Sequence, residues 1–492
     1  MQKIAVTGAG FAGLSAACCL AQKGFEVTIF EKNNTIGGRA RQYQSSGFNF
    51  DMGPSWYWMP DVFEAFVQRF GHEVEDFFEL KKLDPGFVIN FGKGESLSIP
   101  AGLPAIYQVF EKLEPGSAEK LRSFLKEAAY KYEVGMRDLV YQPGLSLSEF
   151  FDLRLLKSLF RMGVFQSFSK YVRKYFRHPQ LIQLMEFPML FLGAMPQDTP
   201  ALYSLMNYAA LAQGTWYPMG GMYNMVDAMA KIATELGVEI KTSAEVEQIV
   251  VEGNKAKGLQ TKKGFFPASF VVGAADYHHV EQHLLKAPHR QYTERYWNTR
   301  VMAPSALIFY LGVNKKLNNL QHHNLFFDAD FQAHARAIYK TPSYPDRPLF
   351  YLCCSTKTDP SVAPEGMENL FLLVPLAPGL EDTPELRRAC FDQVMERLET
   401  HCGEPVRSSI IFNRNYSLTD FQQDYHAYKG NAYGLANTLF QTAIFKPKMR
   451  SPKVKNLFYA GQLTTPGPGV PPSIISGQVV ASLIAKESSK VK

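Results

Sequence analysis

Three glycines and one acidic residue near the N-terminus have the types and spacing of a dinucleotide site. Gly8, Gly10 and Gly13 follow a short apolar stretch, and Glu31 comes 18 residues after Gly13, close to the ~20 residues typical of such units. The glycines permit a tight turn, a close approach of backbone to a pyrophosphate, and close packing of a helix. The helix N-terminus would hold the phosphates. Glu31 would accept hydrogen bonds from ribose hydroxyls and repel a 2′-phosphate, which disfavours NADP.

The elements around these residues come in the order that such a site requires. The pattern predicts a strand over 4–6, a helix over 14–22 and a second strand over 27–30 that ends at Glu31. Phe11 and Ala12 lie between the second and third glycines, and we expect them to contact the nucleotide too. A secretory signal is the alternative interpretation of residues 3–21, but the glycines favour the nucleotide unit. This unit alone does not distinguish FAD from NAD.

Three further turns supply candidate contacts. In the first, Arg39 could neutralise part of the pyrophosphate charge, although a surface turn with a solvated arginine is the alternative. In the second, backbone could approach a flat ring. The third lies between a strand predicted over 457–460 and a helix predicted over 474–486, and it forms a second strand-turn-helix contact unless it merely closes the fold. The candidates are Gly38, Arg39, Gly53, Pro54, Ser55, Gly461, Gln462, Gly469, Val470 and Pro471.

Composition excludes several classes of protein. The 492 residues are 46% hydrophobic and 20% charged, which is typical of a globular chain with ample core. A net charge of +6 is too dilute to indicate a nucleic-acid partner. The strongly apolar segment 187–195 contains a proline and a glycine and is far shorter than the ~20 residues of a membrane span. The six cysteines include no pair separated by two residues, which favours a reducing cytoplasm.

The histidines predict no metal site. His278–His279 and His322–His323 are adjacent pairs, and neighbouring side chains do not share a helix face or a strand face as ligands of one ion would. We interpret both pairs as structural. The chain has no Gly-x-Ser-x-Gly nucleophile turn, and no catalytic acid or base can be nominated from the residues.

Longer motifs link the chain to a known family. They are the segments 456–462 and 465–471 with Ser476 and Gly477, the segment 217–221, and the segment 51–58 that runs from Asp51 to Trp58. Together they resemble the bacterial flavin-dependent carotenoid desaturases of the phytoene desaturase type, within the amine-oxidase-like flavoproteins. The resemblance runs nearly end to end. It implies a noncovalently bound FAD, with the backbone of Val246 against the adenine, and an acyclic C40 polyene as substrate.

The resemblance also implies a fold and a reaction. The fold class is α/β, with a discontinuous Rossmann-like FAD-binding domain over 1–80, 215–285 and 450–492, and an inserted α+β substrate domain over 81–214 and 286–449. The reaction is successive dehydrogenation of phytoene towards lycopene, by hydride transfer to the flavin with loss of a proton. A carotenoid isomerase, a desaturase of a hydroxylated carotenoid and a flavin-containing membrane scaffold without turnover are the alternatives.

Aromatic residues next to the turns are candidates for the substrate pocket. They are Trp56, Tyr57, Trp58, Trp216 and Tyr217, and plain packing is the alternative role for each. The chain has no second Gly-x-Gly-x-x-Gly unit, so we expect a quinone or O₂, rather than NAD(P)H, as the partner that reoxidises the flavin.

A locally basic segment suggests a membrane surface as a second partner. Residues 151–178 carry seven basic residues against Asp152, interleaved with bulky apolar residues, as in an interfacial helix. Ordinary surface helices with solvated charges are the alternative. Because a C40 hydrocarbon must be extracted from lipid, we expect a cytoplasmic protein attached peripherally to the inner face of the membrane. The basic residues are Arg154, Lys157, Arg161, Lys170, Arg173, Lys174 and Arg177.

Overall fold

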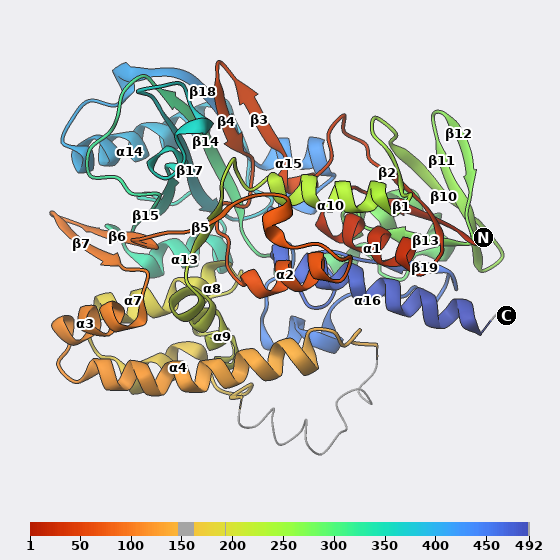
Figure 1. The fold of residues 1–492 in the computed structure, drawn as a ribbon, viewed down its shortest axis with the longest axis horizontal. Helices are drawn as coiled ribbons and strands as arrows, with labels where there is room; N and C mark the ends of the chain where they lie inside the picture. The colour runs from red at the N-terminus through yellow and green to blue at the C-terminus, as the bar shows by residue number, and fades with distance from the viewer. Residues whose placement is uncertain (146–161, 192, 491–492) are drawn as a thin grey trace.

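The computed structural model describes residues 1–145, 162–191 and 193–490. Two parts lie side by side in Figure 1. One surrounds a small parallel sheet and holds both chain ends, and the other combines a larger sheet with a layer of helices.

The parallel sheet is assembled from strands that are far apart in sequence. Its order is β19-β13-β1-β2-β9, and every neighbouring pair is parallel. The strands are Leu457–Tyr459 (β19), Phe270–Gly273 (β13), Lys3–Thr7 (β1), Glu26–Phe30 (β2) and Glu239–Lys241 (β9). The inner strands are short apolar runs because both faces of the sheet are covered, one by helices and the other by a three-stranded sheet within residues 246–267. The carboxyl ends of these strands therefore meet at one edge, where ligands of open α/β sheets bind.

Three helices pack together beside this sheet: Phe11–Gln22 (α1), Asn224–Glu235 (α10) and Val470–Ser489 (α16). Ten of the twelve residues of α1 are buried, because α10 and α16 both pack against it. A helix that is apolar on all sides is stable only in such an enclosed position. The glycine turn before α1 is thereby held against the C-terminal segment.

The larger sheet has seven strands in the order β18-β14-β17-β16-β15-β6-β7. All pairs are antiparallel except β15 with β6. The strands are Ile410–Tyr416 (β18), Ser305–Val313 (β14), Glu368–Leu376 (β17), Phe350–Cys353 (β16), His323–Phe326 (β15), Phe87–Gly92 (β6) and Glu95–Ile99 (β7). Alternation along β14 sends Leu307 and Phe309 into a core with helix Pro384–Cys402 (α14), whereas Ala306 and Ile308 face the interior of the molecule.

A helical layer lies across from that inner face (Figure 1). Smaller sheets and single helices connect these layers. The helices of the layer are Leu103–Leu113 (α3), Ser117–Val134 (α4), Phe168–Tyr175 (α6), Pro179–Glu186 (α7), Pro188–Phe191 (α8) and Leu205–Asn207 (α9). The connecting elements are Gln42–Ser45 (β3), Phe48–Asp51 (β4), Pro60–Gln68 (α2), Leu80–Lys82 (β5), Trp216–Pro218 (β8), Val246–Glu252 (β10), Lys255–Thr261 (β11), Gly264–Pro267 (β12), Phe331–Tyr339 (α13) and Leu418–Tyr425 (α15).

The predicted fold class is confirmed, and most predicted elements match the structure to within a few residues. The helix predicted from residue 474 instead begins at Val470, because Pro471 and Pro472 fit the first turn, where a missing N–H costs nothing. In the part of the chain that is described, no helix is both long and apolar enough to cross a membrane.

The described part of the basic segment, residues 162–178, does not form the interfacial helix that the sequence analysis expected. Arg154, Lys157 and Arg161 lie outside the described residues. In α6, Lys170 and Lys174 are exposed, but the apolar residues between the charges, among them Phe168, are buried in the core. The expectation that these apolar side chains form an interfacial face is therefore wrong for α6, because the helix needs them to pack against α4 and α7.

Candidate functional site

One large cavity, of about 430 Å³, connects the two parts of the molecule. It brings together segments from both chain ends and from the middle of the chain. Seventeen residues were predicted to contact the cofactor, and sixteen of them line the cavity. These are Gly8, Gly10, Phe11, Ala12, Glu31, Gly38, Arg39, Gly53, Pro54, Ser55, Val246, Gly461, Gln462, Gly469, Val470 and Pro471.

Gly13 does not line the cavity, but its lack of a side chain is what allows the turn. A Cβ atom on Gly13 would lie 2.0 Å from the carbonyl oxygen of Gly8, a distance that no packing adjustment tolerates. Gly13 therefore lets α1 start directly behind the turn, as the sequence predicted.

Two helix N-termini open on the cavity without a capping side chain. The N-cap residue is Gly10 in α1 and Gly469 in α16, and neither helix has an acidic residue in its first turn. Uncapped N–H groups and the positive end of the helix dipole attract an anion. The two helix N-termini therefore suit a pyrophosphate at one and another electron-rich part of the same ligand at the other.

Glu31 is held rigidly at the end of β2. Its side chain is buried, and its Oε2 accepts a hydrogen bond from the backbone N of Ala9 at 2.9 Å. Its Oε1 accepts from the backbone N and the side-chain Nδ2 of Asn33 at 2.9 and 3.0 Å. These bonds orient a carboxylate on the cavity wall, where it can accept hydrogen bonds from hydroxyls of a ligand.

Arg39 is a half-buried cation with incomplete compensation. Its guanidinium lies 4.0 Å from Asp276 and donates to the carbonyl oxygen of Asn431 at 3.3 Å. Its Nε has no hydrogen-bond partner among the described residues. Burial lowers the pKa of Arg39 and raises the pKa of Asp276, because both charges have lost water. A bound diphosphate would supply the acceptor that Nε lacks.

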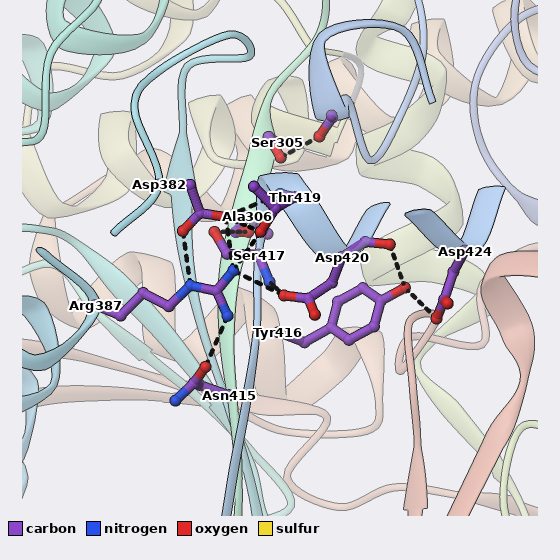
Figure 2. A network of polar contacts seen from close by, with 11 residues as sticks. Ser305, Ala306, Asp382, Arg387, Asn415, Tyr416, Ser417, Thr419, Asp420 and Asp424 are labelled. Atoms are coloured by element: carbon purple, nitrogen blue, oxygen red, sulfur yellow. Dashed lines mark hydrogen bonds and ion pairs between the residues drawn. The ribbon is translucent and has the colours of Figure 1, made fainter. Parts of the chain in front are cut away.

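Helix α15, which the sequence analysis assigned to the substrate domain, forms a further wall of the nucleotide end of the cavity. Figure 2 shows the network that anchors α15 at the sheet edge. Arg387 donates to Asp382 at 2.6 and 2.7 Å and contacts Asp420 at 2.8 Å. The hydroxyl of Tyr416 donates to Asp424 at 2.8 Å. The residues of α15 on the cavity wall are Phe421, Asp424 and Tyr425.

Several lining residues escaped the sequence analysis. Asp276 follows β13 closely, and its place beyond the carboxyl end of a parallel strand could have identified it. His279 stacks on His426 with ring centroids 3.9 Å apart, and burial, together with that neighbour, lowers the pKa of His279 to about 3. No local pattern indicates this second contact, because it joins segments about 150 residues apart.

Away from the nucleotide end, the cavity continues as an apolar arm between the seven-stranded sheet and the helical layer. Tyr351, whose ring centroid lies 5.4 Å from that of Trp56, and Tyr433 are polar side chains on its wall, and burial raises the pKa of Tyr433 to about 12. We see no carboxylate, lysine or imidazole on the described wall of this arm. Its apolar wall includes Phe187, Met206, Ala306, Ile308, Leu325, Phe327, Ile338, Leu349 and Leu373.

Of the five aromatic pocket candidates, Trp56 and Trp58 line the cavity and the other three do not. Tyr57 points the opposite way from its neighbours, because alternate residues of an extended segment face opposite sides, and it packs on Phe63 with centroids 4.5 Å apart. Trp216 donates its Nε1 to Gln213 at 3.0 Å. Tyr217 is buried beside a separate small cavity. The prediction of these three as pocket residues is wrong.

The argument that adjacent histidines cannot share a metal ion is wrong for the pair His322–His323. One ring nitrogen of His322, one of His323 and the sulfur of Cys353 all lie within 4.8 Å of one another. The rule that neighbours diverge applies inside a regular strand, but His322 precedes β15 and its backbone is free to turn.

Known proteins match the chain over nearly its full length. The family model described as flavin containing amine oxidoreductase matches residues 11–485. The chain is 40% identical over 494 residues to a carotenoid 3,4-desaturase of Haloarcula japonica, covering 99% of this chain and 98% of that one. It is 32% identical over 488 residues to a zeta-carotene-forming phytoene desaturase of Myxococcus xanthus, covering 97% and 93%.

A solved structure of the same fold is cyclohexylamine oxidase from Brevibacterium oxydans. It aligns with a TM-score of 0.61 and 16% identity, covering 99% of this chain and 99% of that one, and at this identity the likeness concerns the fold. The residues at the nucleotide end fit FAD, since both open helix N-termini and the unpartnered Nε of Arg39 suit its diphosphate. The chain therefore belongs to the flavin-containing amine oxidoreductase family, in the branch of FAD-dependent oxidoreductases that includes the carotenoid desaturases.

Proposed function

We propose that this enzyme dehydrogenates an acyclic C40 carotenoid, with phytoene converted towards lycopene as the first candidate reaction. The observation that carries the proposal is the apolar arm, which leaves the ring-contact turn at Gly53–Ser55 and is walled by aliphatic and aromatic side chains. FAD bound at the nucleotide end would accept hydride from the substrate. The arm would hold an elongated hydrocarbon in position and exclude water.

A carotenoid that is already partly desaturated is the second candidate substrate. The relative from Haloarcula japonica, at 40% identity, is a carotenoid 3,4-desaturase, whereas the phytoene desaturase of Myxococcus xanthus is 32% identical. The higher identity to the 3,4-desaturase favours a later step in carotenoid desaturation, whereas the sequence motifs suit both phytoene and a later carotenoid as substrate.

A reconstitution experiment tests both candidates. Purified protein with FAD is incubated in liposomes that contain either phytoene or lycopene, and visible spectra are recorded with time. New bands at longer wavelength mean added double bonds and identify the substrate, whereas a small shift of existing bands means isomerisation. Unchanged spectra with both substrates, in protein that retains FAD, would contradict the proposal. Parallel runs with a quinone, with O₂ and with NADPH test the expected acceptor, which is a quinone or O₂.

We also propose that residues 1–80, 215–285 and 450–492 form the FAD domain, and that the inserted segments hold the substrate. All five strands of the parallel sheet come from these three ranges. The proposal needs one extension, since α15 and Tyr433 from the inserted part also line the cavity. A variant that disrupts α15 should therefore weaken FAD binding as well as substrate binding.

For membrane attachment, we propose that the loop 439–445 inserts aromatic side chains into lipid. The side chains of Phe440 and Phe445 are 74% and 50% exposed, with ring centroids 6.3 Å apart. Lys448, just after this loop, donates to the carbonyl oxygen of Gly144 at 2.8 Å, so the loop lies beside the chain that leads into the basic segment. Exposed aromatic side chains that lie together on a loop suit insertion into a lipid interface.

Liposome flotation tests this attachment. The double variant Phe440→Ser, Phe445→Ser should lose most binding to anionic vesicles while it keeps its FAD. Phe265→Ser is the matched control, because Phe265 is 46% exposed on β12 in the other part of the molecule. Equal flotation of the double variant and the control would overturn the attachment without affecting the proposed reaction.

A further inference from the structure

Two histidines and a cysteine meet behind the wall of the large cavity. His323 on β15 pairs with Cys353 on β16 across the sheet, and His322 directly precedes β15. One ring nitrogen of each histidine and the sulfur of Cys353 lie within 4.8 Å of one another. The three residues are only 3%, 0% and 7% exposed. Neither the proposed reaction nor the FAD site uses them.

Each imidazole is oriented through one nitrogen and left unsatisfied at the other. Nδ1 of His322 is 2.7 Å from the hydroxyl of Thr358, and Nδ1 of His323 is 2.7 Å from the hydroxyl of Tyr351. The Nε2 of both rings is buried without a hydrogen-bond partner in the described chain. Metal-binding histidines are oriented by an outer hydrogen bond at the other ring nitrogen, usually to a carboxylate, a carbonyl or water, and here a hydroxyl takes that place on each ring. A buried nitrogen without a partner is unfavourable unless something binds it.

The surroundings suit a cation. Asp359 is 1% exposed and its charge acts on His322. A cavity of about 20 Å³ borders Cys353 and Tyr217, room for one water molecule. The hydroxyl of Tyr217 is also buried without a partner among the described residues.

We propose that His322, His323 and Cys353 bind one Zn²⁺ ion or a similar divalent cation, with a water molecule as the fourth ligand. Two imidazoles and one thiolate form a set of nitrogen and sulfur ligands, which binds such ions in preference to Mg²⁺ or Ca²⁺. On binding, the thiol of Cys353 loses its proton to solvent and the cation takes the sulfur lone pair. No oxidation takes place.

The ion would join two strands behind the substrate arm. The indole of Trp56 stacks on the ring of His323, with centroids 4.1 Å apart and planes 8° apart, and Trp56 lines the arm. A cation that fixes His323 would therefore hold Trp56 against the sheet. This role is structural, and it does not depend on which carotenoid the enzyme uses.

Metal loading of the FAD-containing protein tests the site. After incubation with Zn²⁺ or Co²⁺ and dialysis, elemental analysis should find one equivalent per chain, and Co²⁺ should add absorption at wavelengths longer than the flavin bands. The Cys353→Ser variant should lose the metal and the Co²⁺ absorption. Cys354→Ser and His334→Gln are matched controls, since Cys354 belongs to the core on the other face of the sheet and both ring nitrogens of His334 are already bonded.

The unmodified protein supplies a second readout that needs no variant. Its Tm should fall when a chelator removes the ion and recover when Zn²⁺ is restored. The proposal would be overturned if the loaded native protein held clearly less than one metal ion per chain and its Tm did not change when the chelator was added. Equal metal content in Cys353→Ser and Cys354→Ser would overturn it as well. FAD content measured in the same samples separates this result from any failure of the proposed reaction.

Discussion

The two ends of the large cavity are built from different materials. The nucleotide end consists of backbone turns, two uncapped helix ends and a few fixed charges such as Glu31 and Arg39. The apolar arm consists of alternate side chains of a sheet that faces a helical layer. A diphosphate requires particular groups at particular points, whereas a hydrocarbon requires volume and the absence of water. Mutations should therefore act locally and specifically at one end and by size at the other.

The largest effect is expected at the glycine turn. Gly13→Ala places a Cβ 2.0 Å from the carbonyl oxygen of Gly8, so we expect a loss of about 3 kcal/mol or more in the free energy of unfolding. Gly10→Ala is the informative partner, because its Cβ meets no protein atom closer than 4.0 Å. That variant should keep its stability and lose FAD affinity. Denaturant unfolding and flavin content separate the two, and similar unfolding curves for both would refute this account of the turn.

In the arm, a change of volume should abolish turnover and leave the cofactor in place. Ala306 faces the cavity from β14, and Ala306→Trp would fill the path of the substrate. We expect turnover to fall by at least about 100-fold with normal FAD content, and Ala306→Ser to behave like the native enzyme. Loss of FAD in Ala306→Trp would mean that the two ends are not separate.

Asp51, which lies beside the small second cavity and lines neither end of the large one, supplies a test through pH. Its carboxylate accepts hydrogen bonds from the backbone N of Met222 and Tyr223 at 2.8 and 3.1 Å, and burial raises its pKa from 3.8 to about 6. The folded protein therefore binds the extra proton between about pH 4 and 6, so this group's contribution to stability falls as pH rises through that window.

The Asp51→Asn variant should lose that pH dependence, which amounts to about 2–3 kcal/mol, while the exposed Asp346→Asn should keep it. Unfolding free energies at pH 4.5 and pH 7 measure the difference. If Asp51→Asn retains the native pH profile, Asp51 is not the group that titrates.

The smallest effect is expected at Glu31. In Glu31→Gln the side chain keeps its shape but loses its charge, and its amide faces the donor groups of Asn33. We expect FAD affinity to fall about tenfold, or ~1.4 kcal/mol, with substrate affinity unchanged. Titration of apoprotein with FAD measures this, with the exposed Glu26→Gln on the same strand as control. A matching loss in Glu26→Gln would point to a general charge effect.

The same contrast explains which residues could be predicted. The nucleotide contacts follow from a short, ordered pattern of strand, glycines, helix and acid, and sixteen of the seventeen predicted residues do surround one cavity. Alternate residues of an extended segment face opposite sides, so Trp56 and Trp58 face the cavity and Tyr57 faces away from it. The sequence alone did not show which of the two sides would face the cavity. The wall formed by α15 and the meeting of His322, His323 and Cys353 left no local signal.

By itself, the sequence determined the chemistry of the nucleotide end, because backbone approach and helix ends demand glycines and an acid at short, fixed spacing. It also determined that the chain carries enough apolar residues for a long internal arm. Only the tertiary structure decided which of those residues face the arm, since burial in a core and burial in a pocket select the same side chains. It alone decided which distant polar groups meet, because such contacts depend on how separate strands and helices pack.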